Sequence, residues 1–435
     1  MLDSARFSGL SFIVALCAAS ILVLDGLDIQ LIGIAAPDIV RDLGIDRGAL
    51  APALAAALAG MLIGAPMIGA LGDRWGRRPA LLLSTLLFGF ATLAAATSQS
   101  VNALAAWRLV TGIGLGGALP AAAALMAEFT PRRARSQTLG AALVGVPLGG
   151  ILGALLATKL MPDGSWRALF IAGGMLPILA AVVMFFFMPE SPRFLAGRAT
   201  RSRTLADLLN RIDGRGMRFS NDDSFVLNVP GNSAGLRALF APDLRADTVI
   251  TSLIFLTNIF AIYAFFNWGP LVLTALGWRL DEAVRSTLVF NVAGIAGSLA
   301  VAAAIARWGS RAPLAICSAA GGLTLIGLAF LPRGESTSLL AGIAIAGTTV
   351  SAVQVGMYAV AANVYPTPCR STGIGLSLGV GRTGGILSAF AGSLLLAYAG
   401  AAGFFGAVGA VMLVTVAAVL VLQRHVPRAE QSVRR

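Results

Sequence analysis

Charged residues are scarce in this sequence. Lys, Arg, Asp and Glu together make up 12% of its 435 residues, and hydrophobic residues make up 57%. Soluble globular proteins carry about 25% charged residues. So small a charged fraction does not cover a surface that faces water. The composition therefore excludes an ordinary soluble protein and indicates one embedded in a membrane.

Histidine and cysteine are also rare. The one histidine, His425, lies in an arginine-rich tail, where we expect it to be solvated. The three cysteines, Cys17, Cys317 and Cys369, have no paired spacing, so neither a disulfide framework nor a zinc site is predicted. The glycine-rich pattern of an ATP-binding loop is missing. We expect no metal, no cofactor and no enzymatic activity.

The positive charge is spread along the chain. The net charge is +12, but the basic residues separate apolar segments instead of forming one patch, so no nucleic acid partner is predicted. With the N-terminus inside, 23 of the 32 basic residues fall on the cytoplasmic side and 7 on the other. This bias predicts an inner-membrane protein with both termini in the cytoplasm.

Twelve apolar stretches are long enough to cross a bilayer as helices, which takes about 20 residues each. The first is too long, and too rich in acids, for a cleavable signal peptide. The sequence thus predicts an all-α membrane protein with twelve transmembrane helices. We place these spans at 9–34, 48–71, 79–97, 101–127, 136–158, 167–188, 246–275, 283–305, 312–331, 337–364, 371–397 and 401–422.

The two halves of the sequence repeat each other. PRRARSQTLG at 131–140 matches PTPCRSTGIG at 366–375, GGIL recurs at 149–152 and 384–387, and DRWGRRPALL at 73–82 is echoed at 306–315. This duplication predicts two pseudo-symmetric six-helix bundles, 1–190 and 246–435 with its tail, joined by a cytoplasmic linker at 191–245. Within the linker, the spacing of Leu205, Leu208, Leu209 and Ile212 predicts a short surface helix.

The segment GALGDRWGRRPALL at 69–82 resembles the signature loop between the second and third helices of the major facilitator superfamily. The resemblance covers about residues 10–425. It implies that this loop holds the two halves together in one state of a transport cycle. The gating residues that it implies are Gly72, Asp73, Arg74, Gly76, Arg77 and Arg78. The second-half copy has Ala306 in place of Asp73, so a symmetrical pair of such loops is not expected.

The first helix indicates which family within the superfamily the sequence resembles. Asp25-Gly26-Leu27-Asp28 is similar to a motif of the aromatic acid:proton symporters, a family within that superfamily. Arg108, followed by spaced glycines in the fourth helix, resembles another superfamily motif. The resemblance implies a proton-coupled symporter of small organic anions, chiefly aromatic carboxylates, that works by alternating access.

The physics of the first helix supports proton coupling. Asp25 and Asp28 lie three residues apart on one helix face. Burial and mutual repulsion oppose ionisation of both carboxyl groups, so we expect one of them to bind and release a proton. Arg108 enters from the outer side at a comparable depth. Asp25, Asp28 and Arg108 are therefore the predicted proton-coupling residues.

A second intramembrane arginine, Arg382, stands among glycines in the eleventh helix. A guanidinium in such a place suits an anionic ligand, although an interhelical ion pair is the alternative. Aromatic and amide side chains of the seventh and tenth helices offer apolar faces and polar atoms. The predicted substrate-binding residues are Arg108, Arg382, Asn258, Tyr263, Asn267, Trp268, Gln354 and Tyr358.

Two other functions stay open. GVPLGGILGALLA at 145–157 partly resembles a motif of antiporters, so a drug or metabolite:proton antiporter of the same fold is the first alternative. Its cationic substrates need an acidic cavity, which two intramembrane arginines oppose. A non-transporting membrane sensor is the other alternative, and a large extramembrane output domain would favour it. We expect a monomer whose partners are the organic anion, protons and the lipid bilayer.

Overall fold

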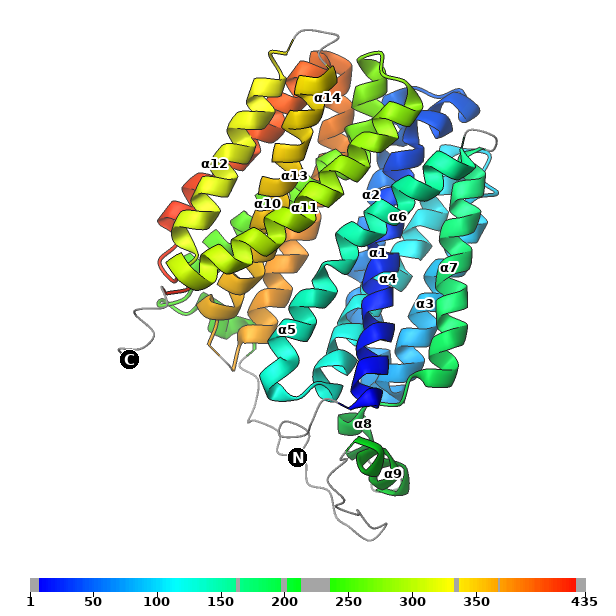
Figure 1. The fold of residues 1–435 in the computed structure, drawn as a ribbon, viewed down its shortest axis with the longest axis vertical. Coiled ribbons are helices and arrows are strands. Elements are labelled where there is room, and N and C mark those ends of the chain that lie inside the picture. The colour runs from blue at the N-terminus through cyan, green and yellow to red at the C-terminus, as the bar shows by residue number, and fades with distance from the viewer. Residues whose placement is uncertain are drawn as a thin grey trace.

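The computed structural model describes residues 8–161, 165–196, 202–212, 235–331, 336–366 and 368–427. Helices and their connections make up the described chain, and they form two bundles that stand side by side (Figure 1). The described ends of the chain, together with two short helices, lie at one end of the molecule, called here the terminal face. The other end is called the opposite face.

The helices of the first bundle follow the hydrophobic runs, because a backbone in lipid must satisfy its own hydrogen bonds. They are α1 (Gly9–Leu43), α2 (Ala51–Trp75) after the short η2 (Arg47–Leu50), α3 (Arg77–Ala95), α4 (Val101–Phe129), α5 (Arg132–Leu143), α6 (Gly145–Leu160) and α7 (Trp166–Phe187).

The linker and the second bundle continue the chain. Two short helices, α8 (Pro192–Ala196) and α9 (Ser202–Ile212), precede the turn η4 (Leu236–Phe240). The second bundle contains α10 (Arg245–Ala275), α11 (Leu280–Trp308), α12 (Arg311–Leu328), α13 (Ser336–Val364) and α14 (Arg370–Val421).

The prediction of twelve spans is confirmed. Eleven described helices are long and apolar enough to cross a membrane, and the last of them has 52 residues. Gly400 interrupts that helix with φ 63° and ψ −162°, so α14 contains two spans. The fifth span, expected at 136–158, is divided by a turn at Val144 into α5 and α6, and its apolar part extends over Gly140–Leu160.

The predicted helix in the linker is also present, as α9. The four apolar residues that predicted it are all buried, and α9 packs on α8 and on α1. Its apolar face thus contacts the protein itself. The predicted bundle boundaries at 190 and 246 stay a prediction, since residues 197–201 and 213–234 lie outside the described residues.

Glycines at repeated positions place the helices of each bundle in backbone contact. A Cβ added to Gly64 would lie 2.0 Å from the carbonyl oxygen of Ile113, and one on Gly297 would lie 2.0 Å from that of Thr348. The GGIL repeat behaves alike: a Cβ on Gly149 would meet the oxygen of Val23 at 2.0 Å, and one on Gly384 would meet that of Leu256 at 2.2 Å. Equivalent glycines thus make equivalent contacts, which gives the sequence duplication its structural counterpart.

Contacts between the bundles lie from the middle of the membrane towards the opposite face. Gly33 of α1 packs against the backbone of Phe266 on α10, where an added Cβ would lie 1.7 Å from its carbonyl oxygen. Further out, the hydroxyl of Ser393 donates to the backbone oxygen of Gly48 at 3.2 Å. The structure is therefore closed at the opposite face.

Candidate functional site

An ion pair between α1 and α4 lies in the first bundle at mid-membrane depth. The Nη1 atom of Arg108 is 2.8 Å from Oδ2 of Asp28, and each side chain is 1% exposed. Nη2 of Arg108 also donates to the backbone oxygen of Asp28 at 3.2 Å, and the hydroxyl of Thr92 on α3 donates to Oδ1 at 2.9 Å. Both carboxylate oxygens thus have donors, which a buried charge requires.

Asp25 lies one turn before Asp28 and is bonded differently. Its side chain is 3% exposed, and Oδ1 has no hydrogen-bond partner among the described residues. Arg382 of α14 lies close enough to interact with it electrostatically. The structure thus gives the two predicted acids distinct environments, because Asp28 is in a closed ion pair whereas Asp25 has an unpartnered oxygen.

Arg382 joins the two bundles. Its Nη1 donates to the backbone oxygen of Met61 on α2 at 3.3 Å, and the side chain is 8% exposed. The predicted alternative, an interhelical ion pair, does not appear among the described contacts of Arg382. A guanidinium bonded only to a neutral carbonyl keeps its charge available for an anion.

Three predicted residues near Arg382 remain partly exposed although they lie inside the molecule: Tyr263 of α10 and Gln354 and Tyr358 of α13. Both tyrosines lie in the neighbourhood of Arg382 and Asp25. The Tyr358 ring meets Phe255 edge to face, with ring centroids 5.4 Å apart. These three side chains therefore border space inside the molecule, next to contacts that close the opposite face.

The remaining predicted residues are more deeply buried. Asn258 is 0% exposed; its Nδ2 donates to the oxygen of Val350 at 3.2 Å, which leaves Oδ1 unpartnered in the described structure. Asn267 is 2% exposed, and its Nδ2 also lacks a described partner. Trp268 is 0% exposed, and a Cβ on Gly392 would lie 2.4 Å from its indole. Trp268 therefore fills the contact between α10 and α14.

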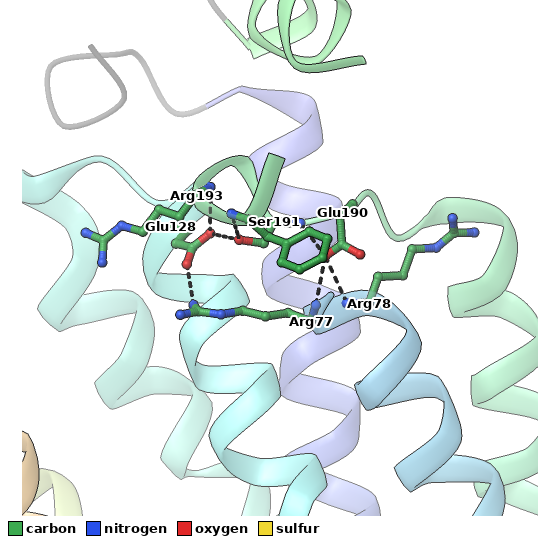
Figure 2. Close-up of polar contacts among 7 residues, drawn as sticks. Arg77, Arg78, Glu128, Glu190, Ser191 and Arg193 are labelled. Carbon is green, nitrogen blue, oxygen red and sulfur yellow. Dashed lines mark hydrogen bonds and ion pairs between the residues drawn. The ribbon is translucent and has the colours of Figure 1, made fainter. Parts of the chain in front are cut away.

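The predicted gating segment lies at the terminal face. Asp73 is exposed in the last turn of α2, and Gly76 turns the chain into α3 with φ 116°. The backbone N–H groups of Arg77 and Arg78 donate to Oε1 of Glu190 at 2.9 and 3.1 Å (Figure 2). A carboxylate at this helix N-terminus satisfies donors that lack partners within α3.

These contacts form a joint between the start of α3 and the segment after α7, and a second carboxylate belongs to it. Arg77 forms an ion pair with Glu128 of α4, and the hydroxyl of Ser191 donates to the other oxygen of Glu128 (Figure 2). The sequence analysis assigned no role to Glu190 or Ser191. Their position directly after the sixth span, at the same depth as the arginines, is the signal that was missed.

The second bundle has a corresponding joint between the start of α12 and the segment after α14, and Arg424 forms an ion pair with the buried Asp247 there. The N–H of Ser310 donates to the oxygen of Val426 at 3.1 Å, and Asn363 donates to the oxygen of His425 at 2.9 Å. The expectation of a solvated His425 is wrong: its Nδ1 lies 3.1 Å from the hydroxyl of Ser310 and its Nε2 donates to Val419. Burial lowers the pKa of His425 below its ordinary value.

Two six-helix bundles that enclose buried charges between them define a membrane transporter. The chain belongs to the Major Facilitator Superfamily, whose family model matches residues 18–341. It is 32% identical over 397 residues to the gallate transporter of Pseudomonas putida, covering 91% of this chain and 88% of that protein. It is 34% identical over 387 residues to the 4-hydroxybenzoate transporter PcaK of Pseudomonas aeruginosa, covering 88% and 86%.

A solved structure shares the fold. The inward open conformation of the xylose transporter XylE from E. coli superposes with a TM-score of 0.76 at 16% identity, covering 95% of this chain and 97% of that one. This similarity shows that the two proteins share a fold. The curated relatives are aromatic acid transporters of the superfamily, as the motif in the first helix implied.

The hydrogen bond from Thr92 to Asp28 provides a test of the buried ion pair. We expect Thr92→Val, which keeps the shape but removes the donor, to destabilise the protein by about 1–3 kcal/mol, because one carboxylate oxygen is left buried without a partner. The measurement is the thermal unfolding midpoint in detergent.

Thr85→Val is the matched control, since Thr85 is equally buried on α3 but donates only to Leu81 of its own helix, at 2.8 Å. Equal midpoints for the two variants would show that Thr92 does not support the ion pair.

Proposed function

We propose that this protein is a proton-coupled symporter of small aromatic carboxylates and that it works by alternating access. The main support for this proposal is that three features occur together. Asp28 and Arg108 form a closed ion pair, Asp25 has an unpartnered oxygen, and Arg382 has no described carboxylate partner. The relatives are named for gallate, 4-hydroxybenzoate and 3-(3-hydroxy-phenyl)propionate, each a carboxylate on an aromatic framework.

In this proposal Arg382 binds the substrate carboxylate. Tyr263 and Tyr358 contact the ring, because tyrosine combines an apolar face with a polar atom. Asn258 and Gln354 each have a buried side-chain oxygen without a described partner, and Asn267 has an unpartnered Nδ2. The two oxygens suit donors such as ring hydroxyls. Trp268, which is packed against α14, supports the site from behind.

Asp25, Asp28 and Arg108 couple the proton. Burying a carboxylate without a partner is costly, and a carboxyl group that binds a proton avoids this cost. While Arg108 contacts Asp28, the guanidinium compensates the carboxylate charge; when the two separate, a proton can take its place. An anionic substrate that attracts Arg108 competes with Asp28 and so links the two fluxes.

A drug:proton antiporter of the same fold is the alternative. Uptake of radiolabelled 4-hydroxybenzoate into proteoliposomes separates the two, since the symporter accumulates this acid under an inward proton gradient. We expect Arg382→Gln to raise KM for the acid about tenfold or more, because a charge-assisted hydrogen bond is lost.

Arg285→Gln is the control for that experiment, because it removes an equal charge from an exposed position of α11. Resistance of cells to cationic dyes without any uptake of aromatic acids would instead support the antiporter.

The coupling residues are tested by comparing two modes of transport. We expect Asp28→Asn to abolish accumulation driven by a pH gradient while exchange of labelled for unlabelled substrate survives, because exchange does not require the empty carrier to return. Arg108→Ala is expected to abolish both modes. Arg108→Lys is expected to restore little, since a lysine lacks the planar fork that contacts two oxygens of Asp28.

Proteoliposomes with and without an imposed pH gradient give the measurement. Gradient-driven accumulation by Asp28→Asn would show that Asp28 is not the coupling residue, and Asp25 would be the next acid to change.

The gating role of Gly72, Asp73, Arg74, Gly76, Arg77 and Arg78 is part of the proposal. Asp73 is exposed here, in a structure closed at the opposite face. We expect Asp73→Asn to slow turnover by altering another state of the cycle, while equilibrium binding of substrate is unchanged. Measuring Kd and the transport rate separately tests this, and lost binding with a normal rate contradicts it.

For the orientation, we propose that the terminal face is cytoplasmic, in the inner membrane, and that the monomer is the transporting unit. The basic residues around α8 and α9 support this side. A cysteine in place of the exposed Asp207 on α9 is expected to resist an impermeant thiol reagent in intact cells and to react in inverted vesicles. Labelling in intact cells would contradict this orientation and show that the terminal face lies outside the cytoplasm.

A further inference from the structure

Two amide side chains that sequence reasoning overlooked bond to each other across the bundles. Nδ2 of Asn291 on α11 donates to Oε1 of Gln30 on α1 at 2.7 Å, and Nε2 of Gln30 donates to Oδ1 of Asn291 at 3.2 Å. Nδ2 of Asn291 also donates to the backbone oxygen of Thr287 at 2.8 Å. Gln30 is 0% exposed and Asn291 2% exposed, so this reciprocal pair is dry.

Helix α6 covers the amide pair through a glycine. A Cβ on Gly150 would lie 2.2 Å from Nε2 of Gln30 and 2.6 Å from Nδ2 of Asn291. The neighbouring Gly149 packs directly on the backbone of α1 at Val23. Helices α1 and α6 therefore form one packed unit of the first bundle, and the amide pair is a polar link between this unit and α11.

The position of the pair relates it to access. Gln30 lies two residues beyond Asp28 in the direction of the opposite face. Gly33 and the Ser393–Gly48 contact lie still further towards that face. The amide pair thus lies between the charged site and the contacts that close the opposite face, where α1 and α11 meet.

The chemistry of the pair suits repeated opening. Breaking it in a dry protein leaves buried amide groups without partners, which is unfavourable. Water that enters an opening path replaces both bonds, and no charges have to be separated. The bonded form is thus stable when this side of the site is dry, and the separated form when it is wet.

We propose that Gln30, Asn291 and Gly150 form the gate between the charged site and the opposite face. The amides are bonded when the opposite face is closed and separate when it opens. The gate rests on the two-bundle transport cycle of the proposed function, but it does not depend on which substrate is carried or on proton coupling.

Gly150→Ala tests the gate, because the added methyl group displaces the flexible ends of both amides. The reporter is Ser393→Cys in a protein with Cys17, Cys317 and Cys369 replaced by alanine, since Ser393 is partly buried and bonds to Gly48 while the opposite face is closed. We expect labelling by an impermeant maleimide from the opposite face to become about tenfold faster, the ratio for loss of one to two ordinary hydrogen bonds.

The matched control is Gly153→Ala on the same helix. Its Cβ would approach only Leu27 and Ile34, at 3.1 and 3.3 Å, and would not touch the amides. We expect labelling at the rate of the parent protein. A rate as high as that of Gly150→Ala would overturn the proposal, since it would show a general loosening of α6.

Two isosteric changes keep the proposal testable if Gly150→Ala does not fold. Gln30→Glu and Asn291→Asp each remove one donor, whereas the double variant removes both and places two carboxylates together. We expect labelling rates to rise from parent to single to double variants, with an effect in the double that exceeds the product of the singles. Parent rates in a monodisperse double variant overturn the gate.

Labelling is measured without substrate, so its outcome is separate from that of the uptake experiments. A protein that fails to accumulate aromatic acids but shows faster labelling in Gly150→Ala keeps the gate and loses the proposed substrate. Normal uptake with unchanged labelling keeps the proposed function and removes the gate.

Discussion

The buried ion pair between Asp28 and Arg108 sets the conditions for the rest of the site. A charge at this depth is tolerated only with several partners, and Thr92 and the backbone of Asp28 supply them. These bonds tie α1, α3 and α4 into one bundle. The pair also engages Arg108, so Asp25, a turn away, has Arg382 of the other bundle as its neighbouring positive charge.

Close packing of the helices makes this arrangement possible. The packing is alike in the two bundles, whereas the charged residues are not. Glycines at equivalent positions bring equivalent helices into backbone contact in both bundles. On this repeated frame the first bundle carries Asp25, Asp28 and Arg108, and the second carries Arg382. The terminal-face joints differ likewise: Glu190 bonds the start of α3 in the first bundle, whereas Asn363 donates to the backbone oxygen of His425 in the second. A transporter needs a symmetric frame to move and an asymmetric site to bind.

Much of the fold could be predicted, because bilayer thickness and backbone hydrogen bonding leave few choices for an apolar chain. The turn at Val144 between α5 and α6 was not predicted. For the site, the intramembrane charges stood out because each is expensive in lipid. The amides Gln30 and Asn291 did not stand out, because a neutral amide in an apolar run is less costly to bury than a charge. The stabilisation that it provides depends on a hydrogen-bond partner elsewhere in the chain.

The sequence by itself determined the membrane class, the twelve spans, the duplication and the acids and arginines that lie within the spans, because each follows from hydropathy or local spacing. Only the tertiary structure decided which of these groups meet. Arg77 joins Glu128 and Glu190, and Gln30 joins Asn291 over 261 positions of sequence. Such pairings depend on how helices rotate and approach, and that is set by glycine contacts between helices distant in the chain, which no local pattern records.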